Sequence, residues 1–208
     1  MVSLYFGVPG CGKTTTAVKL AVSAVVSIAS GRSKYKRVFV NFDCDYPFVT
    51  KVPFDFIGKF DMSDSLIIID EATLYVDNRD YKSFPEHLRN FFLLHRHYGC
   101  DIALFCQQWD AVDKKIRTIT EKVYYIKKSP FFPWRSIIYP LQYGIYIPSS
   151  ASDKDAEFGE ISQGYKLPGL IPRLFAERYD RRRYYHFFDS FQRPELPPLP
   201  EFLSKADK

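Results

Sequence analysis

The sequence predicts an α/β fold in which a mostly parallel central sheet lies between two layers of helices. Short, continuously apolar strands such as Val2–Phe6 and Leu66–Ile69 alternate with helical patterns along residues 1–128. Strands that are apolar at every position are typical of parallel sheets covered on both faces. With 208 residues, of which 46% are hydrophobic, the chain has the size of one domain with an extension.

The expected strands follow one another from the amino terminus. The first, Val2–Phe6, ends at Gly7, where a glycine-rich loop begins. The residues between Asp43 and Pro53 have the composition of a loop. Four further apolar runs predict strands over Arg37–Phe42, Leu66–Ile69, Ile102–Cys106 and Val123–Lys128.

Three helices are expected between these strands. A long one begins at Lys13 and ends near Ser30. Ser83 and Glu86 have the spacing of a capping box with a proline in the first turn, which predicts a second helix running to about Tyr98. The third is a short polar helix over Asp113–Thr120.

The composition changes after residue 128, because the prolines concentrate from Pro130 onward. We therefore divide the chain into a core over residues 1–128, an extension over residues 129–193 and a Pro-rich tail over residues 194–208. The extension is expected to carry a β-hairpin built from the short aromatic strands Ser136–Tyr139 and Gly144–Ile147.

Charge and composition exclude several classes of protein. The formal net charge of +5, from 29 Lys+Arg against 24 Asp+Glu, is too small to indicate a nucleic-acid partner by itself. The sequence contains no apolar run of the roughly 18 to 20 residues that a membrane span needs, and no secretory signal. Its four cysteines lack the spacing of a metal site or a disulfide framework. These features predict a protein of the reducing cytosol.

The strongest motif is GVPGCGKT, at residues 7–14, which matches the phosphate-binding pattern GxxxxGK[ST] of P-loop NTPases in full. Its glycines allow successive backbone N–H groups to converge on phosphates at the start of a helix. Lys13 is expected to reach the β- and γ-phosphates of ATP, and the Thr14 hydroxyl to bind Mg²⁺. The residues expected to bind the nucleotide are Gly7, Val8, Pro9, Gly10, Cys11, Gly12, Lys13, Thr14 and Thr15.

Two carboxylates, Asp70 and Glu71, follow the strand Leu66–Ile69. The carboxyl ends of parallel strands are where ligands bind in such sheets. An aspartate at this position can hold Mg²⁺, usually through water, and a glutamate directly after it can polarise the attacking water. We therefore predict Asp70 as a metal ligand with Thr14, and Glu71 as a catalytic residue for hydrolysis.

Three further catalytic candidates depend on where neighbouring elements lie. Gln107 follows the strand Ile102–Cys106, and lies beside the acidic pair if that strand neighbours Leu66–Ile69. Arg96 and Arg117 are candidates for arginine fingers that reach the site of a neighbouring subunit. Each of the three has a plain alternative, a strand-to-loop transition for the glutamine and a surface position for the arginines.

A basic and aromatic segment covers residues 173–193. Arginines bind phosphates and aromatic rings stack on bases, so contact with single-stranded DNA is one interpretation. We favour the other, a charged loop followed by an aromatic strand that packs on the core, because Glu177, Asp180 and Asp189 dilute the positive charge.

The run from Leu66 to Arg117 resembles the zonula-occludens-toxin-type ATPases of filamentous phages, the gene I assembly-protein family. The matching sequences are LIIIDEA, HRHYGCDIALFCQQ and VDKKIR. The motifs of this family include an acidic pair, an R-H-x-G-x-D approach to the next strand, a T-Q strand tip and an I-R pair. In this chain a cysteine, Cys106, replaces the usual threonine before Gln107. The resemblance covers residues 2–128 well and the remainder loosely.

The resemblance implies an ATP- and Mg²⁺-dependent motor related to the FtsK/HerA-type translocases. Such ATPases act as homo-oligomeric rings, a hexamer being one option, and drive assembly and extrusion of single-stranded DNA phages at the host inner membrane. The implied partners are phage coat or assembly proteins and single-stranded DNA. Family members continue into a membrane span and a periplasmic domain, which this sequence does not contain. We therefore expect the protein in the host cytoplasm, with a peripheral position at the inner membrane as one option. Two interpretations stay open, a truncated or soluble form of the family and a protein whose membrane anchor is a separate chain.

Three other functions stay open at this point, one of which is a nucleotide-gated scaffold that binds ATP and hydrolyses little. A genome-packaging or DNA-translocating ATPase of a tailless phage would share every motif described above. A nucleotide or nucleoside kinase would fit the length and the phosphate loop, but Glu71 argues against it, since a residue that activates water is counterproductive in a transferase.

Overall fold

The computed structural model describes residues 1–74, 85–146, 162–166 and 176–189. The α-helices in these ranges are α1 Lys13–Ala29, α2 Glu86–Leu94 and α3 Lys114–Ile119. The strands are β1 Val2–Phe6, β2 Arg37–Val40, β3 Val49–Lys51, β4 Ser65–Ile69, β5 Asp101–Cys106, β6 Lys122–Lys128, β7 Arg135–Tyr146, β8 Ser162–Lys166 and β9 Glu177–Asp180. Short 3₁₀ turns are η1 Phe54–Phe56, η2 Ala72–Leu74, η3 Trp109–Ala111, η4 Arg181–Arg183 and η5 Tyr185–Phe187.

All the described strands belong to one sheet, whose order is β3-β2-β4-β5-β1-β6-β7-β8, with β9 pairing β7. Strands β1 to β6 pair with one another only in parallel, whereas β7 pairs antiparallel with β6, β8 and β9. The most apolar strands, β4 and β5, lie inside the sheet, and every residue of β5 is buried. The predicted α/β class with a mostly parallel sheet is therefore confirmed.

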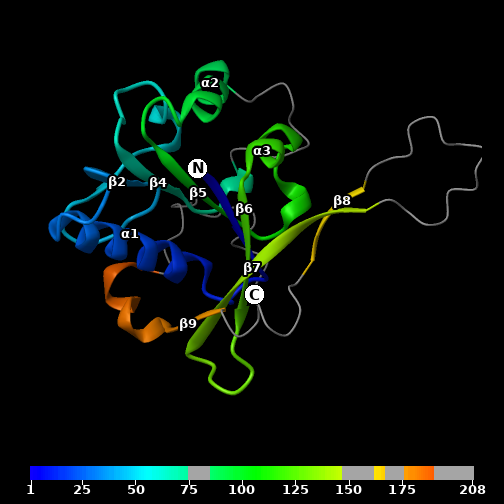
Figure 1. Cartoon of the computed structure of the whole chain (residues 1–208). Helices are drawn as coiled ribbons and strands as arrows, with labels where there is room; N and C mark the ends of the chain where they lie inside the picture. The colour runs from blue at the N-terminus through cyan, green and yellow to red at the C-terminus, as the bar shows by residue number, and fades with distance from the viewer. Residues whose placement is uncertain (75–84, 147–161, 167–175, 190–208) are drawn as a thin grey trace, which may run out of the picture.

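The sheet has a helical layer on each face, as Figure 1 shows, with α1 on one side and α2 and α3 on the other. Small residues of α1, including Ala17 and Ala21, pack on one face of the sheet against Ile68 and Phe105. The opposite face is covered by a second apolar cluster that includes Phe92 of α2. This is the three-layer arrangement that the sequence predicts, and it directs the carboxyl ends of the parallel strands to one edge.

The extension differs from the prediction in one respect. The two short strands expected over Ser136–Tyr139 and Gly144–Ile147 are a single strand, β7, which runs through Pro140. The proline is tolerated because β9 pairs with residues 135–138 and β8 with residues 142–146, so that Pro140 falls between them, where this edge of β7 has no partner among the described residues. The predicted hairpin between these two segments is therefore wrong, and β7 instead pairs antiparallel with β6 and continues the main sheet.

Two other boundaries also differ from expectation. Strand β3 forms within the stretch predicted as a loop, at the edge of the sheet beside β2. Helix α2 ends at Leu94 rather than near Tyr98, since the following residues form tight turns with i→i−3 bonds such as Gly99 N–H to the Arg96 carbonyl, 3.0 Å. The helix is described from Glu86, and the predicted cap at Ser83 lies outside the described residues.

The Pro-rich tail predicted over residues 194–208 lies outside the described residues, and so does most of the stretch between β7 and β9. Among the helices that the structure describes, none combines the length and the apolar character that crossing a membrane would need.

Candidate functional site

The phosphate loop connects β1 to α1 and presents its backbone N–H groups at the start of the helix. Gly10 and Gly12 have φ values of 74° and 99°, which side-chain-bearing residues rarely adopt. The Lys13 side chain is buried and folds back over the loop, with Nζ donating to the Gly7 carbonyl at 3.1 Å. A lysine held here by carbonyl oxygens is placed to exchange them for the oxygens of a phosphate.

The far side of the phosphate loop is held by the extension. Three consecutive loop carbonyls each accept a side-chain hydrogen bond: Gly10 from Arg181 at 3.0 Å, Cys11 from Ser136 at 2.7 Å, and Gly12 from Tyr179 at 3.3 Å. A Cβ atom at Gly12 would meet Ser136 Oγ at 2.5 Å and Arg181 Cδ at 2.7 Å. Glycine is therefore required at position 12 by the packing of the extension as well as by its φ.

Asp70 lies at the end of β4, directly beside the phosphate loop. The Thr14 hydroxyl donates to Asp70 Oδ2 at 2.6 Å, and the Glu71 N–H donates to Oδ1 at 3.0 Å. Asn41, at the end of β2, fixes the backbone here: its amide accepts from Asp70 N–H at 2.7 Å and donates to the Asp70 carbonyl at 2.9 Å. Burial raises the pKa of the Asp70 carboxyl above its ordinary value, against the hydrogen bond from Thr14.

The hydroxyl of Thr14 and the carboxylate of Asp70 are hard oxygen donors, the type that Mg²⁺ prefers. Among the described residues, no group of three or more His, Cys, Asp or Glu side chains converges as a metal site. A Mg²⁺ ion held by these two residues would therefore complete its shell with water and phosphate oxygens, as is usual for this ion in nucleotide sites.

Glu71 follows with its backbone in the left-handed region, at φ 48°. This conformation is uncommon for a residue with a side chain and is found preferentially at functional sites. Because β4 and β5 are neighbours, Gln107 lies beside Glu71, and its Nε2 approaches Glu71 Oε2 at 3.5 Å. The predicted proximity of the glutamine to the acidic pair is observed.

A cavity of about 340 Å³ lies between the phosphate loop and the strand tips. That volume lies within the range of small-ligand pockets. Its walls come from the phosphate loop, the tips of β4 and β5, and the extension; the lining residues are Pro9, Gly10, Gly12, Lys13, Thr14, Thr15, Glu71, Gln107, Arg181, Tyr185 and Phe188.

The two candidate arginine fingers lie elsewhere in the chain. Arg96 is exposed and its guanidinium pairs with Glu121 Oε2 at 2.9 Å, near the amino-terminal ends of the strands. Arg117, on α3, lies over the Trp109 ring, with 5.8 Å between the guanidinium carbon and the ring centre. Neither lines the cavity within the described part of this chain, so a role for either in a neighbouring subunit stays a prediction.

Sequence reasoning missed the contribution of the extension to the site. Arg181, Tyr185 and Phe188 belong to the segment for which we favoured packing on the core over DNA contact. Tyr179 does pack there, but Arg181 reaches the phosphate loop and the two other aromatic residues line the cavity. The only available signal was the density of arginines and aromatics, which indicates neither partner nor position.

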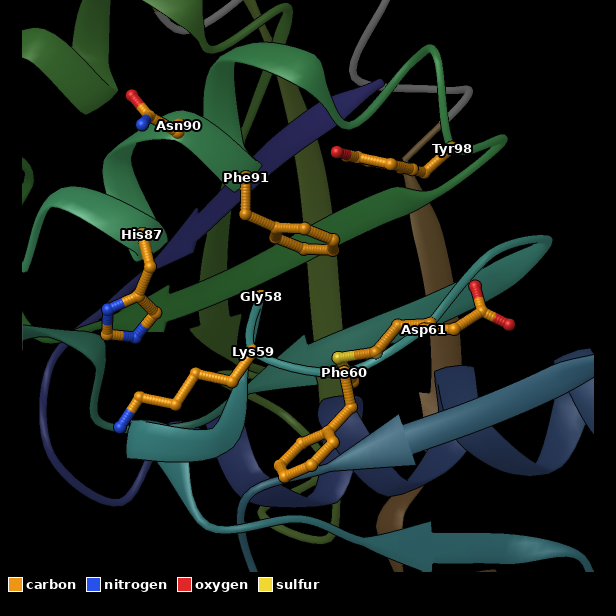
Figure 2. Close-up of a pocket in the computed structure, with 9 residues that line it drawn as sticks. Gly58, Lys59, Phe60, Asp61, His87, Asn90, Phe91 and Tyr98 are labelled. Carbon is orange, nitrogen blue, oxygen red and sulfur yellow. The ribbon is translucent and has the colours of Figure 1, made fainter.

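A second hollow, of about 350 Å³, lies between α2 and the loop at residues 58–62 (Figure 2). The Phe91 ring occupies its centre, and Lys59 and Asp61 point to opposite ends. Because its charged groups are separated around an apolar ring, this hollow does not assemble a catalytic site, and the phosphate-loop cavity is the candidate.

Comparison with known proteins finds similarity to one protein family and to several solved structures. The family model for Zonular occludens toxin (Zot) matches residues 48–131. The crystal structure of the N-terminal domain of zonular occludens toxin from Neisseria meningitidis is similar with a TM-score of 0.52 and 17% identity, covering 90% of this chain and 98% of that chain. Comparison with curated proteins gives no match.

Two further solved structures show weaker likeness. The genome packaging NTPase B204 from Sulfolobus turreted icosahedral virus 2, in complex with ATP-gammaS, has a TM-score of 0.48 and 13% identity, over 67% of this chain and 91% of that chain. The flagellar accessory protein FlaH from Methanocaldococcus jannaschii has a TM-score of 0.47 and 14% identity, over 69% of this chain and 78% of that chain.

The Zot match lies downstream of the phosphate loop, and it includes the acidic pair and Gln107. The structural likeness extends over most of the chain and shows a shared fold. The resemblance predicted from the sequence is confirmed: residues 48–131 match the Zot family model, and the chain has a P-loop NTPase fold that it shares with the Zot N-terminal domain.

Proposed function

We propose that the protein is a Mg²⁺-dependent ATPase that drives phage morphogenesis, by assembling and extruding a single-stranded DNA phage at the host inner membrane. One observation carries the enzymatic part of this proposal. Lys13, Thr14, Glu71 and Gln107 come from three separate parts of the sequence and line one cavity, and Asp70 accepts a hydrogen bond from Thr14 at its wall. The Zot resemblance supports the biological part.

In this proposal each residue has a defined task. The loop N–H groups and Lys13 bind the phosphates, with Lys13 leaving the Gly7 carbonyl for the β- and γ-phosphate oxygens. Thr14 and Asp70 hold Mg²⁺, which neutralises charge on the phosphates when bound. Glu71 orients the attacking water and accepts its proton, and Gln107 fixes the Glu71 carboxylate.

The test of this proposal is ATP turnover without an acceptor, measured with and without single-stranded DNA. The wild type hydrolyses ATP, and Glu71→Gln still binds ATP but loses at least about a hundredfold in rate. Lys13→Ala loses both binding and turnover. Phosphorylation of an added nucleoside without hydrolysis would instead show a kinase, and unchanged turnover in Lys13→Ala would refute the phosphate-loop assignment.

A genome-packaging ATPase of a tailless phage would use the same residues, so the polymer must be identified separately. Stimulation of turnover by phage coat protein but not by duplex DNA favours extrusion. Stimulation by duplex DNA alone would favour packaging.

We further propose a homo-oligomeric ring in which Arg96 or Arg117 acts on the cavity of the next subunit. Subunits that lack the finger, mixed with Glu71→Gln subunits that retain it, then regain turnover that neither preparation has alone. An arginine whose substitution leaves turnover unchanged, or whose loss is not rescued by mixing, is not the finger.

We also propose that the ring acts in the host cytoplasm, at the inner face of the inner membrane, through a separate membrane anchor. Flotation of host membranes tests this arrangement. The protein floats with membranes when the phage assembly proteins are co-expressed, and stays at the bottom when it is expressed alone. Flotation without any phage partner would contradict a separate anchor.

A further inference from the structure

The segment over residues 181–188 crosses beside α1 and is fixed at two points (Figure 1). At its start, the Tyr184 ring packs edge-on against Tyr179, with 5.8 Å between ring centres. Near its end, the Phe187 ring packs edge-on against Tyr46 at 4.9 Å, and the Phe187 carbonyl accepts from the Asp45 N–H at 2.8 Å. The backbone between these contacts is thereby held against the domain.

The residues that follow each of these anchors line the cavity. Tyr185 and Phe188 both line it, and the Tyr185 side chain is 46% exposed. Large aromatic side chains usually bury their rings, so an exposed ring on a fixed segment at the wall of a ligand cavity suggests a surface for stacking.

Arg181, also in the cavity wall, shows a second sign of an occupant. Its side chain is only 9% exposed, and its guanidinium bonds the carbonyls of Gly10 and Pro133. The Nε–H group is buried, and it has no hydrogen-bond partner among the residues that the structure describes. A buried donor normally finds a partner, so the described residues leave this N–H group at the cavity wall unsatisfied.

The cavity therefore has two chemically different walls. Glu71 and Gln107, at the strand tips, form the wall where water must meet the terminal phosphate. Segment 181–188 supplies the aromatic part of the lining and lies beside α1. A nucleotide whose γ-phosphate faces Glu71 can place its base against this aromatic wall.

We propose that Tyr185 and Phe188 form the nucleobase subsite, stacking on the base of a bound nucleoside triphosphate. Arg181 is a positioning residue that holds the phosphate loop through its bond to the Gly10 carbonyl. This inference rests on the proposed function, because it takes a nucleoside triphosphate as the occupant. Stacking uses the face that every base presents, so the subsite binds adenine and guanine nucleotides with similar affinity.

Calorimetric titration with three ligands in the presence of Mg²⁺ tests the subsite. The ligands are a non-hydrolysable ATP analogue, its GTP counterpart and inorganic tripolyphosphate, which lacks a base. Tyr185→Ala weakens both nucleotides about tenfold, as loss of one stacking ring does, and leaves tripolyphosphate within twofold of the wild type. Tyr185→Phe, which keeps the ring, retains most of the nucleotide affinity.

The matched control is Phe60→Ala, which removes a ring that is 63% exposed at the hollow in Figure 2 and leaves all three affinities unchanged. Unchanged nucleotide binding by Tyr185→Ala overturns the subsite, and so does an equal loss for tripolyphosphate. If the wild type hydrolyses ATP in either case, the proposed function stands. A wild type that binds no nucleotide and no tripolyphosphate overturns both.

Discussion

Charged groups lie at both edges of the parallel sheet, but their pairing differs between the two edges. At the amino-terminal edge, Asp101 is paired with the Met1 ammonium at 2.6 Å and with Lys34 at 2.8 Å, and it accepts from the Tyr35 hydroxyl. At the carboxyl-terminal edge, Lys13 is held by carbonyl oxygens, and Asp70 by the Thr14 hydroxyl. Opposite charges neutralise one another at the first edge and are kept apart around a cavity at the second.

The two buried aspartates show what this difference means energetically. For both carboxyls, burial is the largest single influence on the pKa, and its own effect is to raise it. At Asp101 the bonds from Lys34, the Met1 ammonium and Tyr35 together outweigh burial, and the pKa is lowered. At Asp70 burial prevails and the pKa is raised. Asp101 thus stabilises the fold as an anion, whereas Asp70 is an anion at a cost that a bound cation would relieve.

The largest expected difference is in ATP turnover, between two variants that each lack one lysine at one edge of the sheet. Lys13→Ala lowers ATP turnover at least a hundredfold, because it removes the side chain placed to stabilise charge on the phosphates. Lys34→Ala, which removes the same charge from the opposite edge, leaves turnover within about twofold. Steady-state hydrolysis assays compare them, and similar losses in both variants would contradict the division between the edges.

The next largest effect is the change in the free energy of unfolding caused by substituting each of the two aspartates, measured in metal-free buffer. Asp101→Asn lowers the free energy of unfolding by about 2 kcal/mol, since charged hydrogen bonds are lost from a buried position. Asp70→Asn raises it, because an amide can keep the bonds to Thr14 and Glu71 without a buried charge. Chemical denaturation measures both changes, and a decrease for Asp70→Asn would show that its charge is stabilising.

The contribution of Asp101 should also depend on pH with a defined sign. Its folded-state pKa is below its ordinary value, so its stabilisation is complete above the unfolded pKa of about 3.9 and disappears as the pH falls through the folded pKa. The difference in unfolding free energy between the wild type and Asp101→Asn is therefore constant near neutral pH and shrinks below about pH 4. A difference that grows on acidification would reverse the assignment.

The smallest expected effect is that of Arg96→Ala on the stability of the isolated subunit. Its partner is Glu121, but the arginine side chain is 67% exposed, and such surface pairs contribute less than about 1 kcal/mol. Thermal unfolding below the concentration at which subunits assemble checks this. A loss of several kcal/mol would make Arg96 a structural residue of the amino-terminal edge.

Much of the fold was predictable because its signals are local. Strand β4 is apolar along its length, and the phosphate loop fixes the strand before it and the helix after it. Strand β3 was missed because three residues at a sheet edge carry too little pattern. The continuity of β7 was missed because a proline normally interrupts a strand, and here the gap between β8 and β9 accommodates it.

The residues of the candidate site also fall into a predictable and an unpredictable group. Lys13, Thr14, Asp70 and Glu71 lie in short motifs whose spacing indicates their chemistry. The contact between Tyr179 and Thr16 joins residues 163 positions apart, and no local pattern connects them. Arg181 and Ser136 were likewise unpredictable, because what they recognise is the backbone of the phosphate loop, which carries no sequence signature of its own.

The central claim is that a nucleoside triphosphate binds between the carboxyl-terminal edge of the sheet and segment 181–188. Hydrogen–deuterium exchange with and without a non-hydrolysable ATP analogue and Mg²⁺ tests it most directly. We expect slower exchange in residues 7–15 and 181–188, and unchanged exchange in residues 34–36 and 95–101 at the opposite edge. Protection at the opposite edge, or none in residues 7–15, would contradict it.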